Sequence, residues 1–175
     1  MPTIIYDVAV SIDGYISGPS GDISRFAHDG PVVDEYLARL QGYSAAIMGR
    51  GTYEFGYDFR MSPGQNPYPH LRTVVFSRTL HLPGDQVEVR SGDLPDEIAA
   101  LRAEVRGDIY LCGGGAFAAA CLSHGLIDRL ILKRAPILLG GGTPLFADGA
   151  PHLAHVSTKD YRCGTLLQVF DIRRD

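Results

Sequence analysis

Three segments of the chain, each at the end of a predicted strand, carry residue types that bind anions. The first reads IYLCGGGAF over residues 109–117, an apolar run followed by three glycines and a predicted helix. Glycine loses the most chain entropy on folding, so three in succession need a compensating role. Backbone N–H groups at the start of a helix bind phosphate, and the missing Cβ atoms let a ligand approach closely. A tight turn without a ligand is the alternative interpretation of an isolated triplet.

Two further segments repeat this arrangement. Residues 48–52 read MGRGT, where a predicted strand runs into glycines and a helix start, and residues 76–79 read FSRT at the end of another strand. Three strand ends that supply backbone amides, guanidinium groups and hydroxyls favour an extended polyanionic ligand across the carboxyl edge of a sheet. A phosphorylated dinucleotide fits this description, and Arg50, Ser77 and Arg78 suit a ribose 2′-phosphate.

The glycine triplet also matches the spacing of a common nucleotide-binding pattern. Gly113, Gly115 and Ala118 satisfy the G-x-G-x-x-A of the Rossmann fold. That pattern normally opens its domain and is followed by an acidic residue at the end of the next strand. Here the next strand ends on Lys133 and Arg134, and the remaining chain is too short for a doubly wound sheet. We therefore favour a different nucleotide-binding fold.

The elements that must position these segments alternate along the chain. Apolar, β-branched runs predict strands, and apolar residues at helical spacing predict helices. The expected strands span residues 3–12, 44–49, 72–77, 87–90, 108–112, 127–136 and 164–175, and the expected helices span residues 31–41, 93–105 and 116–125. Residues 56–70, rich in proline and glycine, predict a loop. The alternation is typical of a three-layer α/β domain with a mostly parallel central sheet, whose C-terminal strand is antiparallel and near an edge.

Composition excludes several classes of partner. The 175 residues suit one domain, residues 1–175, and the formal net charge of −4 argues against nucleic acid or an anionic membrane as a partner. The N-terminus lacks a basic region, and no apolar run approaches the roughly 20 residues of a membrane span. Three cysteines without a CxxC pair indicate reduced thiols and a cytoplasmic protein. His152 and His155 have no third ligand at a suitable spacing, so we expect no metal.

Five segments in order resemble the dihydrofolate reductase-like fold and, within it, the RibD C-terminal reductase family of riboflavin biosynthesis. Residues 9–16 and 20–22, AVSIDGYI and SGD, resemble that family's SLDG-containing opening. MGRGT at 48–52 resembles the MGR-x-T of dihydrofolate reductases, and VFSR at 75–78 resembles the next cofactor-contacting strand end. The glycine triplet is similar to the shared pyrophosphate turn, and GGGTPLF at 140–146 to a loop near the family's C-terminus. The resemblance covers nearly the whole chain.

The resemblance implies NADPH as the cofactor. By this resemblance Arg50 reads the 2′-phosphate, Thr52 contacts the pyrophosphate, and Ala9 and Ile16 flank the nicotinamide. The complete set of expected cofactor-binding residues is Ala9, Ile16, Gly49, Arg50, Gly51, Thr52, Phe76, Ser77, Arg78, Gly113, Gly114, Gly115, Ala116 and Phe117. The resemblance also implies a homodimer that forms through an edge strand or a helix.

The resemblance implies the cofactor but not the substrate. Riboflavin reductases carry a lysine where this chain has Asp7 and a glutamate where it has Cys112. The exchange of lysine for aspartate changes the pocket by two charge units, so we expect it no longer to favour a ribose phosphate. Aromatic residues Phe26, Phe55 and Tyr57 could wall a ring-binding pocket, although buried aromatics are more often core.

Asp7 is the preferred candidate for a catalytic acid. It lies in an apolar strand two residues from Ala9, so both side chains leave the same side of the pleat. Partial removal from water makes a carboxyl group easier to protonate, which suits proton delivery beside hydride transfer. A carboxylate that only bonds nearby backbone is the structural alternative. Asp34 is the second candidate, because folate enzymes hold the pteridine with a helix acid at a similar distance ahead of the MGR turn.

Together these features predict an NADPH-dependent reductase. Hydride would pass to a C=N or C=O bond of a small planar or sugar-derived substrate, and the resemblance is to 5-amino-6-(5-phosphoribosylamino)uracil reductase and dihydrofolate reductase. The alternative is a non-catalytic NADP(H)-binding module, in which the pocket persists and Asp7 serves only structure.

Overall fold

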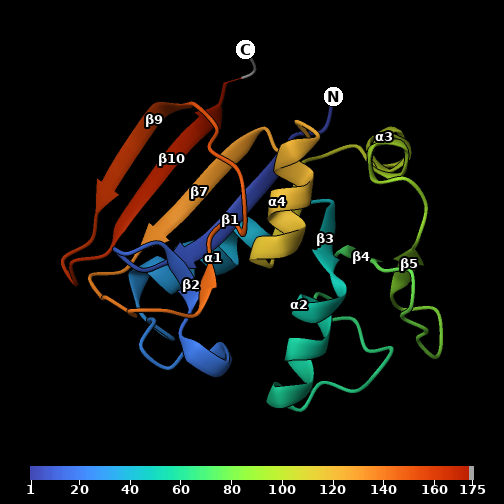
Figure 1. The fold of residues 1–175 in the computed structure, drawn as a ribbon, viewed down its shortest axis with the longest axis horizontal. Coiled ribbons are helices and arrows are strands. Elements are labelled where there is room, and N and C mark those ends of the chain that lie inside the picture. The colour runs from blue at the N-terminus through green and yellow to red at the C-terminus, as the bar shows by residue number, and fades with distance from the viewer. Residues whose placement is uncertain (174–175) are drawn as a thin grey trace.

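One eight-stranded sheet forms the centre of the protein in the computed structural model, which describes residues 1–173 (Figure 1). The strand order is β5-β4-β3-β6-β1-β7-β10-β9. The strands are β1 (Ile4–Val10), β3 (Ala45–Gly49), β4 (Arg72–Phe76), β5 (Glu88–Arg90), β6 (Ile109–Gly113), β7 (Arg129–Arg134), β9 (Leu153–Asp160) and β10 (Leu166–Ile172). The first six strands in this order are parallel, whereas β10 pairs antiparallel with β7 and with β9. A separate pair joins β2 (Tyr15–Ser17) to β8 (Thr143–Pro144).

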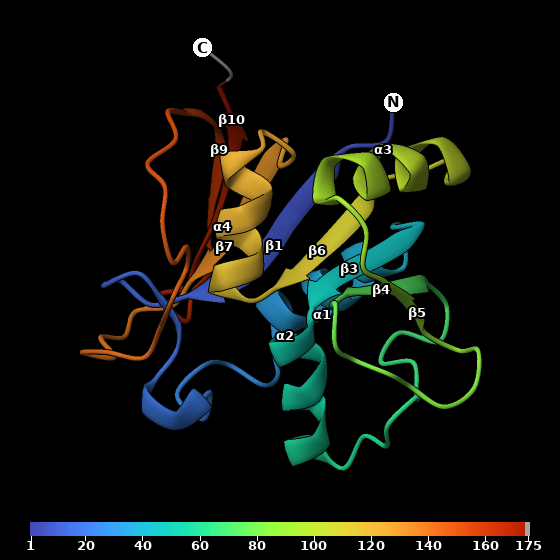
Figure 2. The same ribbon diagram turned by 45° about the vertical axis from the view of Figure 1, so that its right-hand side comes forward.

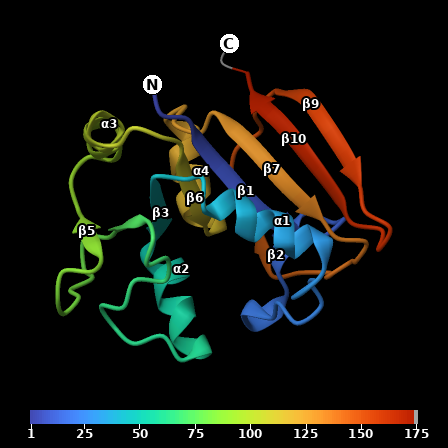
Figure 3. The same cartoon turned by 180° about the vertical axis from the view of Figure 1, so that it is seen from behind.

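Helices cover both faces of the sheet and make a three-layer domain. Helices α3 (Leu94–Glu104) and α4 (Gly115–Ser123) lie on the face toward the viewer in Figure 1, and α1 (Pro31–Leu40) lies on the opposite face, seen in Figure 3. The short helix α2 (Arg50–Phe55) extends beyond the carboxyl ends of the parallel strands (Figure 2). The 3₁₀ turns η1 (Pro19–Gly21) and η2 (Gly56–Phe59) complete the helical elements.

Successive side chains of β1 point to opposite faces of the sheet, so they belong to two different core clusters. Ile4 and Tyr6, both fully buried, pack in the cluster that includes α3 and α4. Ile5 packs instead with Leu40 and with Tyr43, which follows α1. Because side chains alternate across a strand, Asp7 leaves β1 on the α1 side. This register places a carboxylate beneath α1 with only 1% of its surface exposed.

The fold class predicted from the sequence is confirmed, and most elements begin and end within two or three residues of their expected positions. The C-terminal strand is antiparallel and near the edge, although the edge itself is β9, which was not predicted. Nearly all side chains of β9 are exposed, so this strand lacks the apolar alternation that would reveal it. Residues 174–175 of the expected final strand lie outside the described residues. Within residues 1–173 no helix has the length and apolar character needed to cross a membrane.

The glycine triplet has a structural role of its own. Gly113 ends β6 with φ +134°, a backbone conformation that L side chains rarely adopt. A Cβ added to Gly115 would lie 2.3 Å from the carbonyl oxygen of Pro144, so the start of α4 packs directly on β8. The structural alternative to ligand binding therefore explains part of the triplet.

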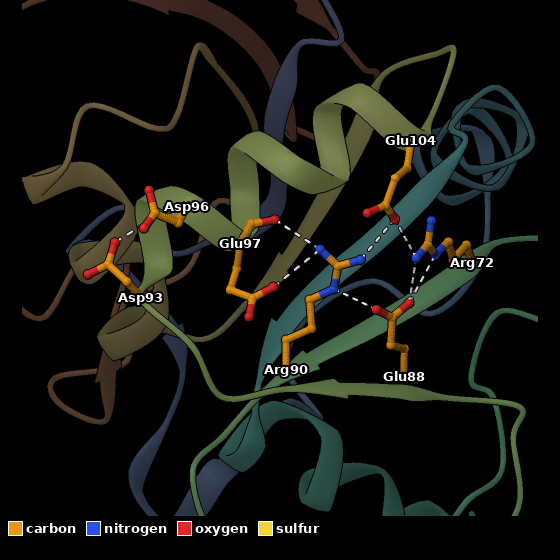
Figure 4. A network of polar contacts seen from close by, with 7 residues as sticks. All are labelled: Arg72, Glu88, Arg90, Asp93, Asp96, Glu97 and Glu104. Carbon is orange, nitrogen blue, oxygen red and sulfur yellow. Dashed lines mark hydrogen bonds and ion pairs between the residues drawn. The ribbon is translucent and has the colours of Figure 1, made fainter.

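A network of charged side chains stabilises the β5 edge of the sheet. Arg90 of β5 is 9% exposed, and its guanidinium contacts Glu88, Glu97 and Glu104 at 2.5–3.4 Å (Figure 4). Arg72 of β4 joins the network through Glu88 and Glu104. These ion pairs join α3 to β4 and to β5. The loop that carries Ser77 and Arg78 connects these two strands.

Candidate active site

A cavity of about 760 Å³ lies at the carboxyl ends of β3, β4 and β6. These three strands are neighbours in the sheet, so the three strand-end segments converge at this edge as the sequence analysis expected. Of the expected cofactor-binding residues, the cavity is lined by Ile16, Gly49, Arg50, Gly51, Thr52, Phe76, Gly114, Gly115, Ala116 and Phe117. Ala9 lines an adjoining cavity, and Ser77, Arg78 and Gly113 line neither of the two.

The start of α4 gives this cavity an anion-binding character. Helix α4 begins at Gly115 and has no side-chain cap at Gly114, so the first backbone N–H groups lack the usual partner. The hydroxyl of Thr52, a residue of α2, lies close to Gly114, because a Cβ added to Gly114 would lie 3.1 Å from its Oγ1. The positive end of a helix beside a hydroxyl and uncovered backbone suits a pyrophosphate.

The side chains expected to read a 2′-phosphate divide into two groups. Arg50 is exposed at the cavity wall, and its Nη1 donates to Oγ1 of Thr79 at 3.1 Å, which joins α2 to the loop after β4. Oγ of Ser77, in contrast, accepts from the backbone N–H groups of Thr79 and Leu80 at 3.2 and 3.0 Å. Ser77 therefore stabilises its own turn, and Arg50 is the cation that lines the cavity.

A second cavity of about 350 Å³ opens beside the first, between β1, β7 and α1. The two cavities share Val8, Ile16 and Ile23 in their walls, so they adjoin one another. Asp7 and Ala9 both line the smaller cavity, as their common side of the pleat predicted. Its remaining walls are mostly apolar and include Phe26, which is 8% exposed.

Asp7 is the centre of a buried cluster of charges. Its Oδ2 accepts from Nε of Arg39 at 2.7 Å and from the hydroxyl of Tyr43 at 3.3 Å. Its Oδ1 accepts from Nζ of Lys133 at 2.6 Å and from Nη2 of Arg39 at 3.2 Å. Two cations therefore compensate one buried carboxylate, as a charge removed from water requires. The pocket end therefore has a formal surplus of one positive charge.

Tyrosine hydroxyls surround this cluster. The hydroxyls of Tyr36 and Tyr110 lie 2.7 Å apart, and the hydroxyl of Tyr68 lies 3.2 Å from Sγ of Cys112. Burial raises the pKa of Tyr36 and of Tyr110 well above the ordinary value. Burial also raises the pKa of the Cys112 thiol. These groups stay neutral at physiological pH, so the charges at this end of the site are those of Asp7, Arg39 and Lys133.

The structure places the other predicted site residues away from this cluster. Asp34 lies exposed in the first turn of α1 and lines neither cavity. Phe55 lines the larger cavity, where its ring contacts Phe59, rather than the smaller one. Tyr57 packs against Tyr53 in a separate core cluster and lines neither cavity.

Arg39 and Lys133 are the residues that sequence reasoning missed. They lie 32 and 126 residues from Asp7, so spacing along the chain does not reveal the cluster. Lys133 carried little signal, because it stands with Arg134 at the charged end of β7, whereas Asp7 interrupts the apolar run of β1. Within the described residues, no three histidine, cysteine or acidic side chains gather closely enough to hold a metal ion.

The fold defines a class of protein, the RibD-type reductase domains of the dihydrofolate reductase-like fold. The sequence matches the RibD C-terminal domain family over residues 2–167, and the chain belongs to this family. Among solved structures, a Shewanella sp. PV-4 protein whose name refers to riboflavin biosynthesis aligns with TM-score 0.85 at 27% identity, over 99% of this chain and 100% of its own. A pyrimidine reductase-like protein from Corynebacterium diphtheriae shares the fold with TM-score 0.72 at 18% identity, over 99% and 93% of the two chains.

Sequence relatives agree with this membership. Protein YyaP of Bacillus subtilis is 26% identical over 95% of this chain and 93% of its own length. The riboflavin biosynthesis protein RibD of Mycobacterium tuberculosis is 29% identical over 81% of this chain. The match spans only 44% of that RibD protein, so it concerns one part of a longer relative.

Proposed function

We propose that the protein is an NADPH-dependent reductase that acts on a small planar substrate. The observation that supports this proposal is that the two cavities adjoin at Val8, Ile16 and Ile23. One cavity has the features of a dinucleotide site, and the other is a mostly apolar pocket with a charged end. Such a pair allows a cofactor and a ring to meet at the shared wall.

The residues of the larger cavity fit NADPH. Backbone N–H groups of α4 and the hydroxyl of Thr52 would hold the pyrophosphate, and Arg50 would hold the 2′-phosphate. Ile16 at the shared wall would flank the nicotinamide, together with Ala9 of the smaller cavity. Bound NADPH supplies a hydride, and the protein aligns the substrate and excludes water.

The smaller cavity would hold the group that is reduced, a C=N or C=O bond. A pyrimidine-like ring agrees with the family, and the exact substrate belongs to the proposal. A non-catalytic NADP(H)-binding module is the second candidate, favoured by the full hydrogen-bonding of Asp7, which would then serve structure alone.

NADPH titration with fluorescence detection tests the cofactor, and NADPH oxidation in the presence of dihydrofolate, pterins, pyrimidines and carbonyl compounds tests the reaction. We expect saturable NADPH binding and turnover with at least one planar substrate. Binding without turnover on any of them would favour the binding module. Absence of NADPH binding would overturn both.

We also propose a cytoplasmic homodimer that forms through β9. This strand is one of the two edges of the sheet, and it exposes Leu153 and Val156. An exposed edge with apolar residues is a template for pairing with a second strand. Light scattering after gel filtration should give a dimer, and Val156→Lys should give a monomer. A monomeric wild-type protein would overturn this assignment.

A further inference from the structure

Lys133 is the one lysine in the site, and its ammonium faces the smaller cavity. The residue lies on β7 opposite Ala9 of β1, and its side chain is 11% exposed. Nζ donates to Oδ1 of Asp7 at 2.6 Å and lies 3.8 Å from the ring centroid of Tyr36. An ammonium carries three N–H donors, so these two contacts leave a donor for a ligand in the cavity.

Asp7, in contrast, has no hydrogen-bonding position left for a ligand. An ionised carboxylate has about four acceptor positions and no donor. Arg39 fills two of these positions, and Lys133 and Tyr43 each fill one. The carboxylate is therefore already saturated by donors from the protein. It can hold Lys133 in place, whereas it has no proton to offer to a ligand in this arrangement.

The remaining walls of the smaller cavity indicate the kind of ligand. They are formed mainly by aliphatic side chains and by Phe26, and no arginine is among the lining residues described. A planar ring fits such walls, and its acceptor atom would meet the positive end of the pocket. Lys133 is the one lysine among the lining residues described, and it is already bound to Asp7, so this end suits a carbonyl oxygen better than a sugar phosphate.

We infer that Lys133 is the residue that contacts the substrate, through a carbonyl oxygen or ring nitrogen of a planar heterocycle, and that Asp7 and Arg39 are positioning residues. This inference rests on the proposed function. In the reduction of a C=O or C=N bond, a bound reduced nicotinamide nucleotide would supply the hydride to carbon, and the heteroatom would gain one proton. The Nζ–H bond of Lys133 breaks as the new O–H or N–H bond forms, which leaves a neutral amine that regains a proton from water.

The chain contains only two lysines, Lys133 and Lys159, which permits a direct measurement. Lys159 lies on β9 and serves as an internal control. Protein labelled with ¹³Cε-lysine should give two signals, which Lys133→Met and Lys159→Met assign. Burial lowers the pKa of Lys133, and Asp7 opposes that shift. Asp7→Asn should therefore move the titration of the Lys133 signal to lower pH and leave Lys159 unchanged. An unmoved Lys133 signal would overturn the positioning role of Asp7.

Binding of quinazoline-2,4-dione to the NADP⁺-loaded protein tests the substrate contact, with naphthalene as a ring of similar size that lacks an acceptor. We expect the dione to shift the Lys133 signal only. Lys133→Met should weaken dione binding about 10- to 100-fold, as expected for the loss of a charge-assisted hydrogen bond. Naphthalene affinity and NADPH affinity should remain unchanged, and Lys133→Arg should restore part of the dione affinity.

The outcomes separate this inference from the proposed function. If NADPH binds but the dione does not bind, or binds equally well to Lys133→Met, the assignment of Lys133 is wrong and the reductase proposal stands. If NADPH itself does not bind, the proposed function fails. The ¹³C signal of the unsubstituted protein decides the question even if Lys133→Met does not fold, because a dione that leaves this signal unmoved overturns the contact.

Discussion

Phe76 and Phe117 stack with their ring centroids 5.2 Å apart and their planes at 25°. Phe76 ends β4, and Phe117 lies in the first turn of α4, so the pair spans the intervening strand β3. It does so beside Gly49, where an added Cβ would lie 3.0 Å from the Cβ of Phe117. The three strand ends that line the larger cavity are therefore packed against one another, and a change at one of them alters the shape of the site.

Replacement of Gly115 should destabilise the fold. The Cβ in Gly115→Ala would lie 2.3 Å from the carbonyl oxygen of Pro144, a backbone atom that cannot move without shifting β8. Overpacking of this kind costs about 1–3 kcal/mol, and urea unfolding measures it. Gly141→Ala is the matched control, because a Cβ there meets nothing within 4 Å. Equal stability of the two variants would contradict the close packing of α4 on β8.

Arg50 should control the choice between NADPH and NADH. It is the arginine that lines the larger cavity, so Arg50→Ala removes a charge-assisted bond to the 2′-phosphate. We expect the Kd for NADPH to rise about tenfold or more and the Kd for NADH to stay unchanged. Arg106→Ala, at an exposed arginine outside both cavities, is the control. Equal losses for the two nucleotides would show that Arg50 does not read the 2′-phosphate.

The sequence predicts the cofactor side of the site much better than the substrate side. Gly49, Arg50 and Gly114 belong to short local motifs at strand ends, and parallel strands bring such ends to one edge. The partners of Asp7 come instead from α1 and β7, and only the tertiary packing of α1 beneath the sheet brings Arg39 to it. Local periodicity contains no information on that contact.

Short or exposed strands could not be predicted from the sequence for a related reason. The pair β2–β8 has only two register positions, at Tyr15 with Pro144 and Ser17 with Thr143, which is too short for a two-residue period to be recognised. The contacts of Asp13 also depend on tertiary packing, because its carboxylate accepts from the backbone N–H groups of Leu139 and Gly140, which lie 126 and 127 residues further along the chain.

Asp13 should make stability depend on pH in the acid range. Hydrogen bonds from Ser11 and from the backbone N–H groups of Gly140 and Leu139 lower its pKa from the ordinary 3.8 to about 2. A lowered folded-state pKa means that the carboxylate stabilises the fold above about pH 4, and that this contribution is lost as pH falls through about 2. Asp13→Asn should therefore lower Tm at pH 7, and the difference from wild type should close near pH 2. Asp29→Asn, at an exposed aspartate, should show no such pattern. A difference that persists at pH 2 would rule out the charge as its source.

Arg90 should contribute to the stability of the β5 end of the sheet. Arg90→Met removes the cation from Glu88, Glu97 and Glu104, whose carboxylates keep partial access to water at 29–41% exposure. Because water can replace part of the lost contacts, we expect a loss of about 1–2 kcal/mol in the free energy of unfolding at pH 7. Hydrogen bonds from Arg72 and Arg90 lower the pKa of Glu104. The penalty should therefore shrink as pH falls below about 4, where the carboxylates become protonated. Arg162→Met, in the exposed turn after β9, should cost nothing measurable.

A double-mutant cycle on Asp7 and Lys133 should reveal strong coupling. Asp7→Asn leaves Arg39 and Lys133 together without their counter-charge, and Lys133→Met removes one of two cations from a carboxylate with 0% exposed side chain. Each single change should cost about 3 kcal/mol in the free energy of unfolding, as for other broken buried pairs. The double variant should cost less than the sum of the two single costs by about 2 kcal/mol, because the second change no longer breaks an intact pair.

The control cycle uses Arg129→Met and Asp171→Asn, whose side chains lie 2.7 Å apart with 39% and 47% exposure. Solvent screening limits that coupling to about 1 kcal/mol or less. Similar coupling in the two cycles would mean that the Asp7 cluster is hydrated in solution, and Asp7 would then be free to serve as the acid after all.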